Sequence, residues 1–279
     1  MIDHCFTPAR QSTSGAVNAP RRSGSKPSTT ATQLLLALTL PLAWGTQVFA
    51  QSTSMTTIGA GLEVVPRYEG SSTYHADPFP IISTSSGAFF IDDLDGGVAY
   101  AFSPHLKVGA ILSVDFGRDE SDGARLKGLG DIDTTAAYGC FVDWKTGAFD
   151  TSAKYLQSTR YGYGATLTLT ERYGIAVSSR DHATLEADTV WADRNSMQTF
   201  FGVTPGQAAD SVAGLPAYSP SAGFKRVTLS GSWTHVLSPS WVVNGNLGVS
   251  SLLGDAARSP IVDHKAWIFG GVGLAYSFR

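Results

Sequence analysis

The fold is decided by a pattern that is clearest in residues 163–175, which read YGATLTLTERYGI. Apolar residues take positions 163, 165, 167, 169, 173 and 175, while glycine, threonine and arginine take positions 164, 166, 168, 170 and 172. Successive side chains point to opposite faces of a β-strand, so this stretch predicts a strand with one apolar and one polar face. The same alternation recurs in residues 57–68, 106–116, 132–144 and 266–278.

Two architectures accommodate many such strands. A soluble sandwich or lipocalin-like barrel buries the apolar faces, whereas a transmembrane barrel turns them outward to lipid and keeps a polar lumen. The predicted strands have about 9–14 residues, close to the roughly 9–11 that cross a bilayer at a tilt. Their polar faces are rich in Gly, Ser and Thr, and only 15% of all residues are charged. Aromatic residues also gather near the strand ends, so we predict an all-β, transmembrane, antiparallel up-and-down β-barrel.

The connections between the strands support this prediction independently. Twelve strands are expected, with ten as the alternative, and single-chain bacterial barrels have even numbers. The expected strands are 56–66, 77–85, 87–92, 95–103, 106–116, 132–144, 148–159, 163–177, 182–192, 223–236, 241–252 and 265–278. The short connections 85–86, 103–105, 145–147, 178–181 and 237–240 fall on one side, and the long connections 67–76, 117–131, 193–222 and 253–264 fall on the other. This sorting predicts periplasmic termini and long extracellular loops.

The first part of the chain has the composition of a targeting segment. Residues 1–33 are polar and basic, residues 34–44 are apolar, and Val48-Phe49-Ala50 resembles a cleavage site. We predict a secretory signal peptide and leader over residues 1–50, and a single barrel domain over residues 51–279. The alternative, a transmembrane helix, needs about 20 apolar residues, more than this run offers.

The last strand carries a second sorting feature. The chain ends in Gly-Leu-Ala-Tyr-Ser-Phe-Arg, with Leu274, Tyr276 and Phe278 at alternate positions. Such an amphipathic end resembles the signal that the barrel-assembly machinery reads in outer-membrane proteins, although Arg279 follows the aromatic residue. The predicted location is therefore the outer membrane of a Gram-negative bacterium, with lipid and the assembly machinery as partners.

Three short motifs and the C-terminal strand together resemble one family. The first motif is Val65-Pro66-Arg67-Tyr68-Glu69-Gly70-Ser71 with Asp77-Pro78-Phe79-Pro80, the second is Phe200-Phe201-Gly202-Val203-Thr204, and the third is Leu253-Gly254-Asp255-Ala256-Ala257 with Ser259-Pro260-Ile261-Val262. In this order and spacing they resemble the MipA/OmpV family of outer-membrane proteins, the family of the MltA-interacting protein, over about residues 56–279. The positions that carry the resemblance are Pro66, Tyr68, Gly70, Ser71, Pro78, Pro80, Phe201, Gly202, Val203, Gly254, Asp255, Ser259, Pro260 and Ile261.

The resemblance implies a role rather than a reaction. The best-known member is similar to a scaffold that brings a lytic transglycosylase and a peptidoglycan synthase together, and no catalytic residue belongs to that role. We therefore expect a non-enzymatic scaffold or structural protein of the cell envelope. The alternatives are a narrow channel for small solutes, and adhesion or recognition through the long loops.

Motifs for cofactors, metals and hydrolysis are not apparent. The histidines after residue 50, His75, His105, His182, His235 and His264, do not form a zinc-binding pattern. Residues 92–97 contain three aspartates but lack the spacing and distal Glu of a calcium loop, so they predict a tight turn. No nucleophile elbow or P-loop occurs, so an outer-membrane hydrolase is only a distant alternative. A net charge of −3 argues against nucleic-acid binding.

Charged residues on the polar faces are expected to point into the lumen. They are Glu63, Arg67, Lys107, Asp115, Asp133, Asp143, Lys154, Arg172, Glu186, Asp188 and Lys265. Their balanced signs favour a packed lumen held by ion pairs over a pore lined for one kind of ion. Ile111 interrupts the alternation of its strand, whereas Cys140 shares the apolar face with Tyr138 and Trp144 and is expected to face lipid.

The longest loop contains one helix signal. Thr204, Pro205 and Gln207 have the spacing of an N-cap, a first helical residue and a capping-box partner. The pattern predicts a short helix ending near Gly214, as a lid or decoration on the outer side.

Overall fold

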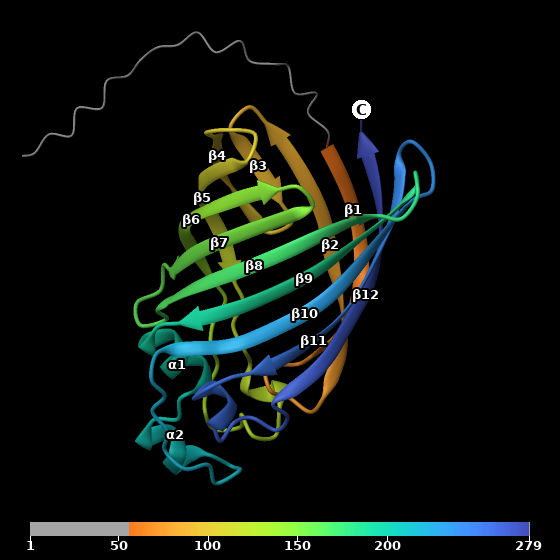
Figure 1. Ribbon diagram of the computed structural model, residues 1–279. Helices are drawn as coiled ribbons and strands as arrows, with labels where there is room; N and C mark the ends of the chain where they lie inside the picture. Colours follow the sequence, from red (N-terminus) through yellow and green to blue (C-terminus); the bar gives the residue numbers. More distant parts are fainter. Residues whose placement is uncertain (1–55, 279) are drawn as a thin grey trace, which may run out of the picture. The chain divides into compact units, whose positions relative to one another are not determined.

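Twelve antiparallel strands close into a barrel, as the sequence predicts. The structure is a computed structural model and describes residues 56–278 (Figure 1). Each strand pairs with its sequence neighbours, and β1 closes the barrel against β12. The strands are β1 (Thr56–Pro66), β2 (Tyr74–Ser86), β3 (Phe89–Asp92), β4 (Asp95–Ala101), β5 (Leu106–Asp115), β6 (Thr135–Thr146), β7 (Phe149–Ser158), β8 (Ala165–Ala176), β9 (Asp181–Ala192), β10 (Gly223–Val236), β11 (Trp241–Leu252) and β12 (Ala266–Phe278).

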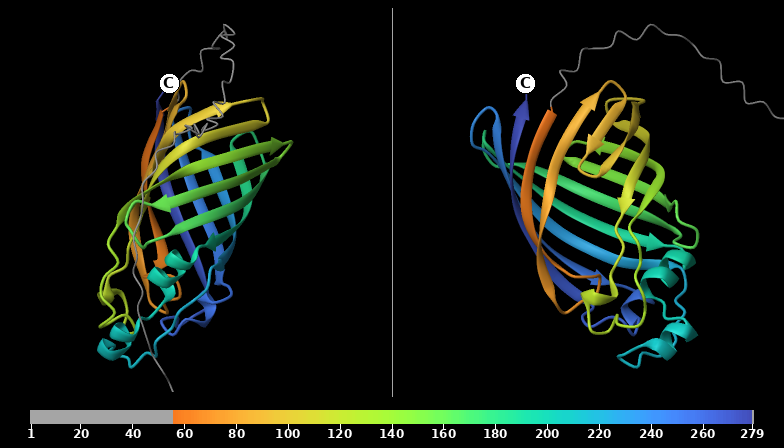
Figure 2. Two further views of the ribbon diagram at one scale, coloured as in Figure 1. Left: turned by 90° about the vertical axis from the view of Figure 1, so that its left-hand side faces the viewer. Right: turned by 180° about the vertical axis from the view of Figure 1, so that it is seen from behind.

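The two ends of the barrel differ in their connections. Thr56 pairs with Phe278, so both ends of the described chain lie at one end of the barrel, which we call the terminal end. The turns after β2, β4, β6, β8 and β10 lie there too. The other end, the loop end, carries the long segments and all helices of the described residues (Figure 2). These are α1 (Arg194–Phe201), α2 (Pro205–Asp210) and the 3₁₀ turns η1 (Glu120–Asp122) and η2 (Ala256–Arg258).

The barrel wall is apolar outside and polar over much of its inside. Leu62, Leu112 and Leu247 expose 59%, 65% and 65% of their surface on the outer face. Cys140 is also exposed, in register with Ala110 on the outer face of β5, as its position in the alternation predicts. Ile111 is buried on the lumenal side, which explains why it interrupts the apolar face of β5.

Several expected strand boundaries are wrong at the loop end. The strand expected from residue 163 begins at Ala165, because Gly164 has a φ of +77° and turns the chain. The strand expected from residue 132 begins at Thr135. Consequently Arg67, Asp133 and Lys265, which we expected in the lumen, lie beyond strand ends. Asp133 pairs there with Arg160 at 2.5 Å, and 60% of its side chain is exposed.

The terminal end requires smaller corrections. β4 ends at Ala101 rather than at residue 103. At the loop end, β2 begins earlier than expected, at Tyr74, which pairs with the last residue of β1. The strand expected over residues 87–92 is reduced to four residues in β3. Gly87 has a φ of +61° in the turn that precedes β3, and such a turn cannot continue an extended strand.

The helix in the longest loop begins as predicted. The Thr204 hydroxyl accepts a hydrogen bond from the Gln207 backbone, and the Gln207 side chain accepts one from the Thr204 backbone. The helix ends at Asp210, not near Gly214, which has a φ of +65° in the following turn. The preceding helix α1 was not expected, although its N-cap Asp193 accepts a hydrogen bond from Ser196. Neither helix is long and apolar enough to cross a membrane.

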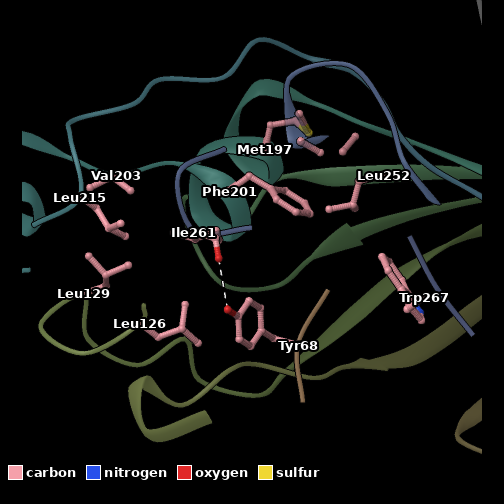
Figure 3. Close-up of a cluster of buried hydrophobic side chains, with 12 residues drawn as sticks. Tyr68, Leu126, Leu129, Met197, Phe201, Val203, Leu215, Leu252, Ile261 and Trp267 are labelled. Atoms are coloured by element: carbon pink, nitrogen blue, oxygen red, sulfur yellow. Dashed lines mark hydrogen bonds between the residues drawn. The ribbon is translucent and has the colours of Figure 1, made fainter. Parts of the chain in front are cut away.

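The largest hydrophobic core lies outside the barrel lumen. Buried apolar side chains from the ends of strands and from four long segments meet at the loop end. We call these segments, residues 67–73, 116–134, 193–222 and 253–265, the loop cap. Figure 3 shows Tyr68, Phe201 and Ile261 facing one another within it.

Candidate functional site

Tyr68 ties the loop cap together. Its ring is buried, and its hydroxyl lies 3.2 Å from the Ile261 carbonyl oxygen (Figure 3) and 3.3 Å from a carboxylate oxygen of Asp263. Burial and the negative charge of Asp263 raise the pKa of Tyr68 to about 12. Asp263 also accepts hydrogen bonds from Ser72 and Arg125. One carboxylate therefore links three segments of the cap.

Most of the motif positions gather around this centre, although they are far apart in the sequence. Phe201, Val203 and Ile261 are almost completely buried, and Ser71 and Ser259 are buried polar residues beside them. The Ser259 hydroxyl donates to the Phe201 carbonyl oxygen at 2.6 Å, and the Pro260 carbonyl oxygen accepts from Arg125 at 2.9 Å. The short motifs are thus parts of one packed structure.

The remaining cap motif residues set the path of the chain. Gly70 has a φ of +98°, and a Cβ there would lie 2.9 Å from Val262, so both backbone and space favour glycine. Gly202 ends α1, where a Cβ would lie 2.0 Å from the Gln198 side chain. The Asp255 carboxylate accepts from the Ser221 backbone at 2.8 Å and pairs with Arg258.

Four other motif positions have simpler placements. Pro66 is the last residue of β1, and Gly254, with a φ of +49°, precedes η2. Pro78 and Pro80 lie in β2, away from the cap, and their rings are exposed on the outer face. Packing in the cap therefore does not account for the presence of proline at these two positions of β2.

Glu69 points from the cap into the mouth of the barrel. Its two carboxylate oxygens lie 2.9 Å from Lys225 Nζ and 2.6 Å from Arg226 Nη1, both on β10. Burial raises the pKa of Glu69, but the charges and hydrogen bonds of Lys225 and Arg226 outweigh it and lower the pKa to about 2. No simple sequence motif marks this clamp, because Glu69 and its partners are more than 150 residues apart.

A cavity of about 340 Å³ lies between the cap and the wall. Its lining includes Glu69, Lys225, Arg118 and the aromatic rings of Tyr163 and Phe200. Arg118 donates to the Phe200 carbonyl oxygen at 3.0 Å, while its buried Nε has no partner among the described residues. Burial lowers the pKa of Arg118 to about 10, so it remains charged at neutral pH.

Charges inside the barrel are mostly paired. Lys107 lies 3.0 Å from Asp143, and Arg172 lies 2.5 Å from Glu186. Lys154 pairs at 3.0 Å with Asp95, a lumenal residue that is not among those predicted from the alternation. Asp188 lies 4.0 Å from Arg226, whereas Glu63 and Asp115 make no ion pair with another described residue. A second cavity, of about 470 Å³, is lined by residues of β1 and β9–β12 and by Glu69.

A serine, a histidine and an aspartate also meet at the terminal end. The Ser178 hydroxyl lies 2.6 Å from Asp181, and His235 Nδ1 lies 2.7 Å from the same carboxylate. In a catalytic triad the histidine lies between the serine and the acid. Here the aspartate lies between the serine and the histidine, which is not the order of a catalytic triad. The cluster instead has the hydrogen bonds of a turn. No group of three or more metal-binding side chains occurs within residues 56–278.

The predicted assembly-signal residues lie together on β12. Leu274 and Phe278 are exposed on the outer face, and the ring of Tyr276 packs between Trp241 and Phe278. Recognition by the assembly machinery stays a prediction.

Comparisons with solved structures find distant similarities. Among solved structures, an outer-membrane channel from Pseudomonas putida F1 is 8% identical, with a TM-score of 0.43, covering 81% of this chain and 95% of that chain. The KdgM porin is 10% identical, with a TM-score of 0.39 and coverages of 80% and 99%. The NanC porin is 8% identical, with a TM-score of 0.38 and the same coverages. No curated protein matches the chain.

The family assignment rests on a separate comparison. The sequence profile described as MltA-interacting protein MipA matches residues 58–278, which include all twelve strands except the first two residues of β1. The matched region also contains every motif position in the loop cap. This outer-membrane β-barrel therefore belongs to the MltA-interacting protein MipA family.

Proposed function

We propose that this barrel is a non-enzymatic scaffold of the cell envelope. The observation that carries the proposal is the packed cap at the loop end. The cap has its own hydrophobic core, Glu69 clamps it to β10, and most lumenal charges are paired. An open channel needs a continuous wet path with weakly held charges, whereas a binding protein needs a rigid frame. The arrangement of Ser178, Asp181 and His235 also favours a non-catalytic role.

The proposed orientation places the terminal end in the periplasm. Bacterial barrels have short periplasmic turns and longer extracellular loops. The cap then faces the cell exterior, and an enzyme of the peptidoglycan layer meets the terminal end. This orientation requires a docking surface among the short turns.

Two of these turns form such a surface. The β8–β9 and β10–β11 turns lie side by side at the terminal end (Figure 1), and Val236 donates to the Arg180 carbonyl oxygen at 2.8 Å. Trp233 donates to Asp181 at 3.2 Å and stacks on His235. We call residues 177–181 and 233–241 the terminal knob. Its exposed apolar side chains include Val177 and Leu237, at 62% and 50% exposure.

The proposed partner is an MltA-type lytic transglycosylase, which the family name supports. A peptidoglycan synthase is a second proposed partner, by analogy with the scaffold role. An apolar knob at the water-facing rim offers the kind of surface that a protein interface covers. The knob is the proposed contact for the transglycosylase.

Cross-linking in cells followed by purification and mass spectrometry tests this function. The native barrel is expected to recover a transglycosylase above the level of an unrelated control barrel. Val177→Asp in the knob is expected to abolish recovery, whereas Val212→Asp, at a site in the cap that is 75% exposed, is expected to preserve it. Equal recovery with both variants would contradict the knob as the contact surface. No recovery with the native barrel would contradict the scaffold function.

Planar-bilayer recording separates the scaffold from a channel. The native protein is expected to be silent because the cap and the Glu69 clamp obstruct the mouth. A steady conductance in the native protein would favour the narrow-channel alternative. Adhesion through the loops would instead appear as cell binding that is lost when residues 205–214 are deleted.

A further inference from the structure

One part of the barrel wall is not closed by strand pairing. β3 has only 4 residues and β4 has 7, whereas their neighbours β2 and β5 have 13 and 10. β2 pairs with β3 only from Ser83 to Ser86, and β5 pairs with β4 only from Lys107 to Leu112. Toward the loop end, β2 and β5 therefore have edges that pair with no other strand of residues 56–278, and these free edges face each other beyond the β3–β4 hairpin (Figure 2).

The free edges are the sides of a bounded window. Its terminal-end boundary is the β3–β4 turn, where Asp93 donates to the Ile82 carbonyl oxygen at 2.6 Å. Its loop-end boundary is the cap, where Tyr68 packs so closely on Gly123 that a Cβ there would lie 2.7 Å from the ring. Along β2 the free edge spans residues 74–81, or about 26 Å at 3.3 Å per residue.

The two prolines of β2 suit an edge that faces lipid. Asp77, Phe79 and Ile81 alternate with Pro78 and Pro80, and Ile82, two residues after Pro80, directs its backbone toward Asp93 rather than β1. Backbone groups alternate in direction along a strand, so the positions of Pro78 and Pro80 also face the window. Proline has no N–H, and an unpaired N–H costs most where no water can bind it. The prolines thus remove donors that lipid could not satisfy.

The lumen beside the window has an apolar surface between two charged side chains, the inward-facing Asp77 and Lys107, whose Nζ lies 5.6 Å from the centre of the Phe141 ring. Phe79 and Ile81 of β2 point inward, and Phe90, Ile111 and Phe141 continue the same surface. Phe90 and Phe141 meet edge to face at 5.6 Å. We call these five side chains the lumenal apolar patch. The opposite wall, by contrast, is lined by polar residues such as Thr228, Ser230 and Asn246.

Glycines make room for this patch. A Cβ at Gly61 would lie 2.3 Å from the Phe79 ring, and one at Gly109 would lie 2.4 Å from the Phe141 ring. The tips of the large rings therefore lie directly over glycines of neighbouring strands. The cavity of about 340 Å³ is lined by Val114 and Asp115 at the loop end of β5 and extends from there toward β6–β8 and the cap.

We propose that the window is a lateral portal through which an acyl chain of a membrane lipid reaches the lumenal apolar patch. The outer surface beside the window is apolar, with Leu112 and Phe116 at 65% and 61% exposure, so the window opens toward hydrocarbon. An acyl chain matches both this outer surface and the patch inside, whereas a polar solute matches neither. The portal does not depend on the scaffold role.

Photolabelling in vesicles tests the portal. The probe is a phospholipid with a diazirine at the end of one acyl chain, mixed into phosphatidylglycerol vesicles that hold the folded protein. Labels are expected on inward-facing residues Phe79 and Phe141 as well as on outward-facing Leu112 and Tyr138. Labels confined to outward-facing residues would overturn the portal.

A variant sharpens the result. Phe141→Gln makes the patch polar and is expected to abolish inward labels while leaving outward labels unchanged. The outward labels report insertion and folding in the same sample. Val142→Gln, at the neighbouring outward position, is the matched control and is expected to keep the inward labels. If Phe141→Gln does not insert, the distribution of labels in the native protein still decides the proposal. Inward labels that persist in an inserted Phe141→Gln protein would contradict binding at the patch.

Discussion

The loop cap and the barrel wall keep their apolar side chains away from water in opposite ways. In the cap, Phe201 and Ile261 are shielded by protein, and buried hydroxyls such as that of Ser259 bond to backbone carbonyls. In the wall, Leu229 and Leu247 are exposed on the outer face, where lipid covers them. The cap thus resembles a small water-soluble domain, whereas the wall depends on the bilayer. One part of the chain is therefore stabilised by burial within the protein and the other by contact with lipid, and substitutions can separate the two contributions.

The largest expected effect is in the core of the cap. Phe201→Ala removes a ring that is 1% exposed and is expected to destabilise the cap by about 3–5 kcal/mol. The matched substitution Phe89→Ala removes a ring that is 69% exposed on the outer face. Lipid chains can fill the space it leaves, so it should have little effect. Protease digestion reports whether the cap is folded, and heat-dependent gel mobility reports whether the barrel is folded.

This comparison is informative only if the barrel survives loss of the cap. We expect Phe201→Ala to become protease-sensitive at the loop end while the wall keeps its folded gel mobility. Simultaneous loss of both would show that the cap and the wall form one cooperative unit.

The Glu69 clamp is expected to have the next largest effect. Its pKa of about 2, against an ordinary value of 4.5, corresponds to a stabilisation of roughly 3 kcal/mol at neutral pH. Because the folded pKa is the lower one, the stabilisation is complete above pH 4.5 and is lost as the pH falls toward 2. Glu69→Gln should remove it at all pH values.

The measurement is the stability of the cap as a function of pH in the native protein and in Glu69→Gln. The difference between the two is expected to be constant above pH 4.5 and to shrink as the pH approaches 2. Other carboxylates titrate in both proteins and cancel in the difference. A difference that does not change with pH would contradict the clamp.

What the sequence predicts follows the same division between wall and cap. The wall repeats a local rule, so the position of a residue in the alternation was enough to place Cys140 outside and to recognise Ile111 as an exception. The Thr204 capping box was equally local. The cap depends on contacts such as Tyr68 with Ile261, 193 residues apart, which no local pattern encodes.

Helix α1 and the shortening of strand β3 were not predicted, and the sequence signals for them differ in strength. In α1, Met197, Phe200 and Phe201 follow helical spacing after the N-cap Asp193, so this helix was detectable. The shortened β3, by contrast, had no clear signal, because its residues alternate as well as those of a longer strand. Pro78 and Pro80 were the available indication, since proline inside a predicted strand favours an edge.

The inverted polarity of the wall can be tested within one strand. Leu229 lies near the middle of β10 on the outer face, and Ser230 lines the lumenal cavity. Leu229→Arg is expected to cost about 2–4 kcal/mol, because it places a charge in the centre of the membrane. Ser230→Arg should cost less, since Glu186 and Asp188 line the same cavity. Unfolding by urea in lipid vesicles measures both. Equal costs would contradict the assigned faces.

The smallest expected effect concerns the hydroxyl at the centre of the cap. Tyr68→Phe keeps the buried ring but removes the donor that lies 3.2 Å from the Ile261 carbonyl oxygen and 3.3 Å from Asp263. The expected cost is about 0.5–1.5 kcal/mol, the usual contribution of one hydrogen bond. Tyr161→Phe, at a fully exposed tyrosine of the loop end, is the control and should change nothing. Proteolysis of the cap under increasing urea measures the stability of the cap in both variants. A cost equal to that of Phe201→Ala would mean that the polar centre formed by Tyr68 and Asp263 stabilises the cap as much as a buried ring of its hydrophobic core does.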